Sequence, residues 1–195
     1  MGKFIIVASL IILGLFGVFV INNNATTPKP TTENSTLNLS SVSPSPLPGI
    51  INSMDNKTTS AIIKTSKGDI EIVFYTEDAP NTVSNFVQKA KSGFYNNLTF
   101  HRVEDWVVQG GDPLGNGTGG GNMPTELNNK PFTAGSLGVA RGGDINVSND
   151  AQFFITKTDA SWLNGQYANF GIVTKGMDVV NKIEIGDKIL GIILQ

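Results

Sequence analysis

Apolar and polar positions begin to alternate near residue 60, and this pattern predicts short strands through the rest of the chain. Ile70, Ile72 and Phe74 lie on one face of a segment that follows a turn at 66–69, which is the period of two expected for a half-buried strand. Similar apolar segments, separated by turns rich in Gly and Asn, continue to the C-terminal end. The predicted strands are 61–65, 70–75, 98–103, 106–109, 138–140, 151–156, 168–173 and 189–194.

Two segments have the spacing of a helix instead. The first begins at Pro80, which suits a first helical turn, places Val83 and Phe86 on one face and ends at Gly93. The second covers 175–183. Many short strands with only two helices predict a mainly β fold, a closed antiparallel barrel whose ends are covered by helices.

Before this region, residues 4–21 form an uncharged apolar run of 18 residues. As a helix the run would be about 27 Å long, close to the ~30 Å hydrocarbon core of a bilayer. We therefore expect 1–21 to be a transmembrane anchor. A cleaved signal peptide is the alternative, although 21–25 offer only a weak cleavage site. Lys3 precedes the run and no further cation occurs before Lys29, so the remainder should be extracytoplasmic, anchored to the membrane or secreted after cleavage.

Residues 22–59 predict a linker. Asn, Thr, Ser and Pro dominate them, and such a composition buries too little apolar surface to compensate for the entropy lost on ordering. Flexible-chain scaling gives the segment a reach of roughly 35 Å. The folded domain is therefore expected to occupy 60–195.

Composition narrows the range of functions. The chain has 195 residues with 14 Lys and Arg against 16 Asp and Glu, so its formal net charge is −2 and no basic patch indicates a nucleic-acid partner. It contains no Cys, which excludes disulfides, thiolate zinc sites and a cysteine nucleophile. His101 is the sole histidine and no carboxylate cluster accompanies it, so neither a metal nor another cofactor is expected.

The segment 100–113 concentrates the residues with chemical potential. It places Arg102, Trp106 and Gln109 between apolar residues and a glycine-rich loop. An arginine beside packed apolar groups needs a carboxylate partner or a functional role, because burying an unpaired charge is unfavourable. The pattern favours a small, partly apolar site.

Other interpretations of nearby residues are less favoured. Gly115, Gly117 and Gly120 have the spacing of a dinucleotide fingerprint, but no helix or βαβ unit accompanies them, so we interpret them as a tight loop that admits a peptide backbone. His101 has no serine nucleophile in a suitable context, which predicts a hydrogen-bonded structural role. The acidic residues show no spacing that would select the paired carboxylates of a hydrolase. They are Glu104, Asp105, Asp112, Asp144 and Asp150.

Four blocks of sequence, in order and at similar spacing, resemble the cyclophilins, a family of peptidyl-prolyl cis-trans isomerases. The resemblance covers nearly the whole predicted domain. The blocks are APNTVSNF (79–86), FHRV (100–103) with QGGDP (109–113), NGTGG (116–120), and QFFIT (152–156) with WLNG (162–165).

The resemblance implies a closed eight-stranded antiparallel barrel capped by two helices, with an outer groove that binds an Xaa-Pro peptide. Arg102 would be the catalytic arginine and Gln109 the neighbouring amide that contacts the substrate. The implied peptide-binding residues are Trp106, Val107, Phe154 and Leu163 around the proline, Gln152 and the backbone of Ala140 and Arg141 beside it, Gly117 in the glycine loop, and Trp162 and Tyr167.

The sequence departs from the family pattern at three places. The segment from Arg102 to Gln109 is one residue shorter than usual. Trp106 and Val107 replace the Phe and Met of many relatives, and Tyr167 stands where many have a histidine.

The implied reaction is a non-covalent rotation about Xaa-Pro bonds, in which the guanidinium of Arg102 donates to the nitrogen lone pair that localises as the amide twists. We expect a monomer that assists the folding of proline-containing extracytoplasmic polypeptides without a cofactor. The position of Trp162 also implies a cyclosporin-type ligand. The alternative is a non-catalytic module that holds proline-containing segments as a membrane-tethered chaperone or scaffold. A surface barrel with no peptide partner is a third class.

Overall fold

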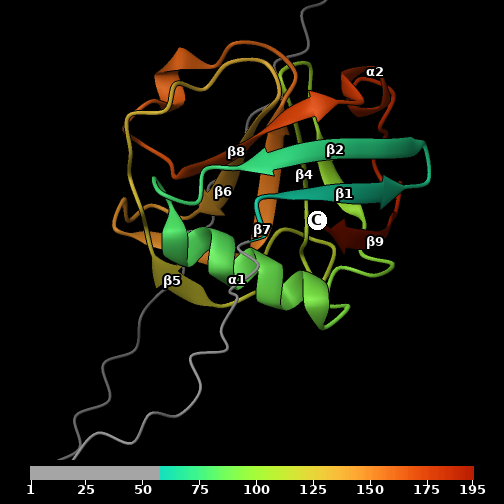
Figure 1. Ribbon diagram of the computed structural model, residues 1–195, viewed down its shortest axis with the longest axis horizontal. Helices are drawn as coiled ribbons and strands as arrows, with labels where there is room; N and C mark the ends of the chain where they lie inside the picture. Colours follow the sequence, from blue (N-terminus) through green and yellow to red (C-terminus); the bar gives the residue numbers. More distant parts are fainter. Residues whose placement is uncertain (1–57) are drawn as a thin grey trace, which may run out of the picture. The chain divides into compact units, whose positions relative to one another are not determined.

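The computed structural model describes residues 58–195, drawn in colour in Figure 1. The predicted anchor or signal peptide at 1–21 lies outside the described residues, as does the predicted linker apart from its last two positions. None of the helices within 58–195 combines the length and the apolar character needed to cross a bilayer.

The described part of the chain is mainly β. Its strands are β1 (Ser60–Thr65), β2 (Gly68–Phe74), β3 (Phe100–Val103), β4 (Val107–Gly110), β5 (Asn122–Pro124), β6 (Ser136–Arg141), β7 (Val147–Thr156), β8 (Asn169–Lys175) and β9 (Ile189–Leu194). Its helices are α1 (Pro80–Lys91), the short α2 (Met177–Val180) and the 3-10 helix η1 (Ser161–Leu163).

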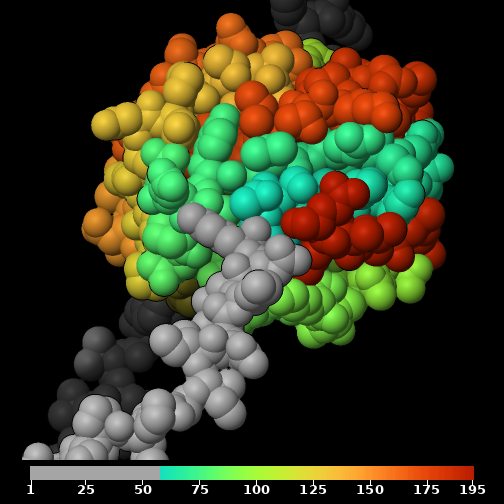
Figure 2. Space-filling model, viewed as in Figure 1, coloured from blue at the N-terminus to red at the C-terminus, as the bar shows by residue number. Residues whose placement is uncertain are grey.

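Eight of these strands form a curled antiparallel sheet in the order β3-β4-β7-β6-β8-β2-β1-β9, and β5 pairs with β7. Figure 2 shows β2, β1 and β9 side by side on one face of the molecule. The first and last strands approach each other where Thr99 forms an isolated bridge with Lys188 and Phe100 forms backbone hydrogen bonds with Gly186 and Asp187. The predicted mainly β, eight-stranded antiparallel fold is confirmed. Its described strands make a curled half-barrel whose edges meet at this bridge, rather than a barrel closed along whole strands.

Helix α1 begins at Pro80, as predicted, and is capped from far along the chain. The carboxylate of Glu126 accepts hydrogen bonds from the backbone N–H groups of Asn81 (3.0 Å) and Thr82 (2.7 Å). Burial alone would raise the pKa of Glu126, but these bonds outweigh it and hold the pKa below its ordinary value. Gly93, with a φ of 74°, follows the last helical turn.

The second predicted helix is much shorter than expected. Of the segment 175–183, only Met177–Val180 is helical. Gly176 has a φ of 95°, in the left-handed region, so the helix cannot extend back through it. Lys175 belongs to β8 instead.

The inside of the curl is filled by aromatic and aliphatic side chains. The ring of Phe86 in α1 lies 5.0 Å from that of Tyr95, 5.4 Å from that of Phe153 and 5.3 Å from that of Phe170, measured between centroids. Side chains alternate along a strand, so Phe153 faces this core while Phe154 faces the other side of the sheet. A second, smaller apolar cluster forms there, made of Val107, Phe132, Phe154, Ala160 and Leu163.

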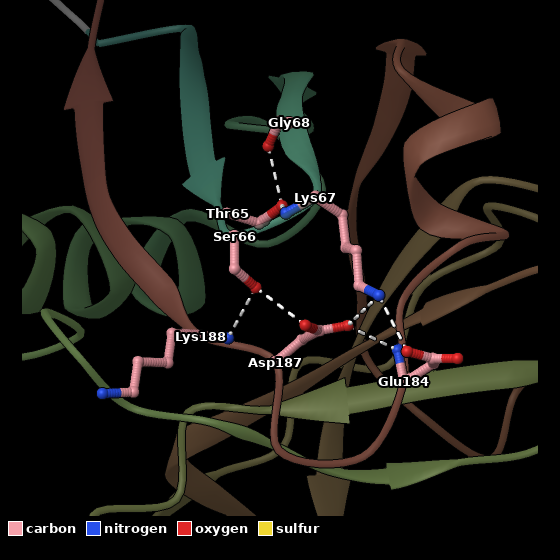
Figure 3. A network of polar contacts seen from close by, with 7 residues as sticks. All are labelled: Thr65, Ser66, Lys67, Gly68, Glu184, Asp187 and Lys188. Carbon is pink, nitrogen blue, oxygen red and sulfur yellow. Dashed lines mark hydrogen bonds and ion pairs between the residues drawn. The ribbon is translucent and has the colours of Figure 1, made fainter.

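A polar network joins the β1–β2 turn to the segment before β9 (Figure 3). Ser66 Oγ donates to one carboxylate oxygen of Asp187 (2.9 Å), and Lys67 Nζ lies 3.5 Å from the other. Lys67 also donates to Glu184 (2.8 Å). The backbone carbonyl of Asp187 accepts from the N–H of Phe100, so the network holds the segment that meets the start of β3.

Candidate active site

Strand pairing sets several predicted site residues in one row. Arg102 in β3 pairs with Gln109 in β4, Gln109 pairs with Phe154 in β7, and Phe154 pairs with Gly138 in β6. Residues directly opposite each other in an antiparallel pair point to the same face of the sheet. A cation, an amide and an aromatic ring therefore lie side by side on the outside of the curl.

Phe154 lies over Gly138, because only glycine leaves room for its ring. A Cβ at position 138 would come within 2.1 Å of Phe154 Cζ. The Phe154 ring stacks on Phe132 and meets Tyr167 edge-on, with 5.8 Å between centroids in both pairs. The apolar floor made by these rings is completed by Val107, Ala160 and Leu163.

Arg102 is held at the edge of this floor by three neighbours. Its Nε donates to Glu104 Oε1 (2.7 Å), its Nη1 donates to Gln109 Oε1 (3.2 Å), and its guanidinium lies 5.4 Å from the centre of the Trp106 ring. The other carboxylate oxygen of Glu104 accepts from Trp106 Nε1 (2.9 Å). The hydrogen bond from Arg102 lowers the pKa of Glu104. Within residues 58–195, two of the five N–H donors of Arg102 are engaged, which leaves three for a substrate.

Trp106 lies outside the strand predicted for 106–109. Strand β4 begins at Val107, and the backbones of Glu104 and Val107 bond to each other (2.9 and 3.4 Å). Asp105 and Trp106 consequently form a two-residue turn. The turn places the Trp106 ring edge-on to that of Trp162, with 5.5 Å between centroids.

A chain of amides fixes the orientation of Gln109. Its Nε2 donates to Gln152 Oε1 (2.9 Å), and Gln152 Nε2 donates to the carbonyl of Gly119 (2.8 Å). The amide oxygen of Gln109 is thereby turned toward Arg102. Gln152 is only 3% exposed, so it supports Gln109 from beneath.

The glycine-rich loop is organised around Asp112, which is 1% exposed. Its carboxylate accepts from the backbone N–H groups of Leu114, Asn116 and Gly117. Burial alone would raise the pKa of Asp112, but these three bonds prevail and lower it. Gly119 is needed because a Cβ there would meet the Asp112 carboxylate at 2.0 Å. The glycine at position 119 thus permits a close contact within the protein itself, between the loop backbone and the Asp112 carboxylate.

These elements surround a cleft of about 650 Å³. Ten of the twelve predicted site residues line it, namely Arg102, Trp106, Gln109, Gly117, Ala140, Arg141, Phe154, Trp162, Leu163 and Tyr167. Val107 is buried in the floor, and Gln152 borders an adjoining hollow of about 330 Å³. The cleft and the hollow share Gln109, Gly117, Ala140 and Arg141.

Three lining residues were not predicted as parts of the site: His101, Asn116 and Gln166. Asn116 falls in a block that resembles the family, so the sequence carried a signal for it. His101 was expected to be hydrogen-bonded, yet its two ring nitrogens are buried without a partner among residues 58–195. Burial is the main cause that lowers the pKa of this histidine.

Known proteins are similar to this chain over the region that contains the sheet and the cleft. Residues 60–190 match the family described as cyclophilin type peptidyl-prolyl cis-trans isomerase/CLD. A peptidyl-prolyl cis-trans isomerase of Synechococcus elongatus is 42% identical over 139 residues, which cover 69% of this chain and 94% of that protein. Peptidyl-prolyl cis-trans isomerase 9 of Schizosaccharomyces pombe is 41% identical over 138 residues, and the chain spans only 22% of its length.

A solved structure is similar over the same region. The crystal structure of a cyclophilin type peptidyl-prolyl cis-trans isomerase from Cryptosporidium parvum, determined in the presence of the dipeptide Ala-Pro, matches with a TM-score of 0.65 and 27% identity. The match covers 70% of this chain and 98% of that one.

Proposed function

This chain belongs to the cyclophilin-type peptidyl-prolyl cis-trans isomerase family, and we propose that it catalyses rotation about Xaa-Pro bonds in the cleft beside Arg102. The observation that carries the proposal is an anchored guanidinium with free donors at the edge of an apolar floor. A proline ring can pack on Phe154 and Leu163, which are 4% and 5% exposed. The amide nitrogen of that ring would then face Arg102.

The barrier to be lowered is electronic. Delocalisation of the nitrogen lone pair gives the peptide bond a rotational barrier of about 18–20 kcal/mol. As the amide twists, the lone pair localises on nitrogen and becomes a hydrogen-bond acceptor. Arg102 donates to it most strongly at that point, which favours the twisted state over the planar one. The bond is stronger because the guanidinium remains charged at any working pH.

Gln109 supports this step from two sides. Its oxygen holds Arg102 Nη1, and its nitrogen is fixed by Gln152, so the amide cannot reverse without losing both bonds. We infer that Gln109 keeps the guanidinium directed at the prolyl nitrogen and offers the substrate backbone an oriented amide. No covalent intermediate is required.

Arg102→Ala tests the mechanism. Removing one preorganised donor of this kind costs about 10²–10³ in rate, so kcat/KM on an Ala-Ala-Pro-Phe peptide should fall by that order. Arg102→Lys should recover only a small part, because a compact ammonium lacks the planar fork that donates to Glu104 and Gln109 from separate nitrogens and keeps further N–H groups for the substrate. Thermal unfolding serves as the control for folding. Equal rates for parent and Arg102→Ala would reject the mechanism.

The alternative function, a non-catalytic peptide-binding module, is tested with the same peptide. In that case NMR spectra of the peptide would show binding shifts without faster cis-trans exchange.

Trp162, 59% exposed on the rim, is the residue on which a cyclosporin-type ligand would rest. Trp162→Ala should then weaken binding of that ligand more than it lowers isomerisation of the peptide.

We further propose that the enzyme assists the folding of polypeptides outside the cytoplasm as a membrane-anchored or secreted monomer. The apolar run at 4–21 and the preceding Lys3 support this compartment. If the domain is anchored, protease added to intact protoplasts of the native cells should digest it; if it is secreted, it should be found in the culture medium. A protected, cell-associated domain would contradict the proposal. Mass spectrometry of the mature N-terminus decides between anchor and cleaved signal.

A further inference from the structure

Arg141 ends β6 and borders both the cleft and the adjoining hollow. Its Nε donates to the carbonyl of Gln166 (2.8 Å) and its Nη1 to the carbonyl of Gly142 (2.9 Å). The guanidinium lies 4.5 Å from the centre of the Tyr167 ring, a cation–π contact. The side chain is therefore already oriented at the place where the two hollows meet.

The charge of Arg141 is not compensated by any ion pair among residues 58–195, whereas that of Arg102 is paired with Glu104. These two arginines are the only Lys, Arg, Asp or Glu residues that line the cleft in the described part of the chain. Asp144 borders the adjoining hollow, but its carboxylate accepts from the backbone and side chain of Asn146. One positive charge is thus left for whatever occupies the cleft, in a chain whose net charge is −2.

We propose that Arg141 makes the enzyme prefer Xaa-Pro segments that carry an acidic residue next to the proline. The inference rests on the proposed isomerase function and names a class of substrate for it. Tyr167, on which the guanidinium lies, contacts the floor residue Phe154, so a carboxylate adjacent to a proline on that floor is within reach. Two of the five N–H donors of Arg141 are engaged within residues 58–195, and the planar fork of the rest suits a carboxylate.

The preference can be measured with short peptides. One series, Ala-Xaa-Pro-Phe, varies the residue before proline, and a second, Ala-Ala-Pro-Xaa, varies the residue after it, with Glu, Gln or Lys at Xaa. NMR exchange gives kcat/KM for each peptide without an auxiliary protease, corrected for its uncatalysed rate. An exposed ion pair corresponds to a preference of about 1.4- to fivefold for Glu over Gln in at least one series. The Lys peptide should be disfavoured, and salt should reduce both effects.

Variants identify the source of the preference. Arg141→Gln should reduce the Glu-to-Gln ratio to about one, and Arg141→Lys should restore part of it. Lys175→Gln is the matched control: it removes one positive charge from an ion pair with Glu71, outside the cleft. It should leave the ratio as in the parent. Each ratio is taken within one variant, so a smaller folded fraction cancels.

The outcomes separate the two proposals. If the parent does not accelerate exchange of the neutral Gln peptides, the proposed isomerase function fails. If it does, but the Glu-to-Gln ratio is near one in both series or is the same in Arg141→Gln as in the parent, the role of Arg141 is rejected. A ratio that falls equally in Lys175→Gln also rejects it, because net charge would then be the cause.

Discussion

Glu104 is expected to position Arg102 without touching the substrate, and Glu104→Ala tests this. The carboxylate accepts one hydrogen bond from Arg102 Nε (2.7 Å) and one from Trp106 Nε1 (2.9 Å). Without it, Arg102 retains only the 3.2 Å bond to Gln109. The guanidinium can then rotate about that one hydrogen bond, and its other neighbour, the Trp106 ring, loses the group that ties it to the turn.

The expected fall in kcat/KM follows from how exposed the ion pair of Arg102 and Glu104 is. The side chains of Arg102 and Glu104 are 42% and 46% exposed, and an ion pair so exposed contributes about 0.2–1 kcal/mol. Loss of the upper value from the transition state lowers kcat/KM about fivefold, since tenfold corresponds to about 1.4 kcal/mol. The fall should appear mainly in kcat, because the contact with the prolyl nitrogen strengthens only as the amide twists.

The assay is kcat and KM on the neutral Ala-Ala-Pro-Phe peptide, together with tryptophan fluorescence, which reports the altered surroundings of Trp106. Asp105→Asn is the control, because Asp105 is the exposed neighbour and its side chain has no hydrogen bond or ion pair among residues 58–195. An unchanged kcat in Glu104→Ala refutes the positioning role. An equal fall in Asp105→Asn would attribute the effect to the local negative charge instead.

Lowering the pH should have the same effect on kcat as the Glu104→Ala substitution, because it protonates Glu104. The hydrogen bond from Arg102 lowers the pKa of Glu104 below its ordinary value of 4.5. A carboxyl whose pKa is lowered in the folded protein contributes fully above its unfolded value and loses its contribution as pH falls through the folded one. The difference between parent and Glu104→Ala should therefore persist above about pH 4.5 and shrink below it.

Three further predictions concern the supports of the site. Gly138→Ala should displace the Phe154 ring, since the new Cβ would lie 2.1 Å from it; overpacking of this kind costs about 1–3 kcal/mol, measurable by urea unfolding, and kcat/KM should fall with it. Asp112→Asn should destabilise the domain by about 1–3 kcal/mol, because a neutral amide replaces the acceptor of three backbone N–H bonds; the parent should lose this contribution as pH falls below 3.8, since the pKa of Asp112 is lowered. His101 is half-buried, and the burial of its ring lowers its pKa, so the unfolded chain binds the proton more readily and stability should fall as pH drops below 6.5. His101→Phe should reduce this slope in urea titrations at pH 5 to 7.5.

The pairing of Arg102 with Gln109 was predictable because it depends on local structure. Arg102 and Gln109 stand on two short strands joined by a tight turn, and a hairpin aligns such residues whatever the rest of the sheet does. Phe154 was predictable only through the resemblance, since its contact with Gln109 joins strands distant in sequence. The alternation along β7 shows that Phe154 faces away from Phe153, but it does not show which residues Phe154 contacts.

Other features of the fold could not be predicted from the local sequence. Strand β5 contains Asn122, Met123 and Pro124, which show no apolar alternation, and it exists because β7 offers an edge to pair with. The N-terminus of α1 is capped by Glu126 rather than by a residue beside it. The helical spacing at 175–183 was misleading, because a left-handed Gly176 and the end of β8 occupy its first positions.

The turn between β3 and β4 links the spacing of the sequence to the geometry of the site. With seven positions from Arg102 to Gln109, the strands pair up to Glu104 and Val107 and leave a two-residue turn. Residues two apart on a strand share a face, so Glu104 extends the row of Arg102 and meets its Nε, while the turn returns Trp106 to the same carboxylate. The two-residue turn therefore accounts both for the position of Trp106 and for the carboxylate that anchors Arg102, and Arg141 is the cation of the cleft that no ion pair within 58–195 neutralises.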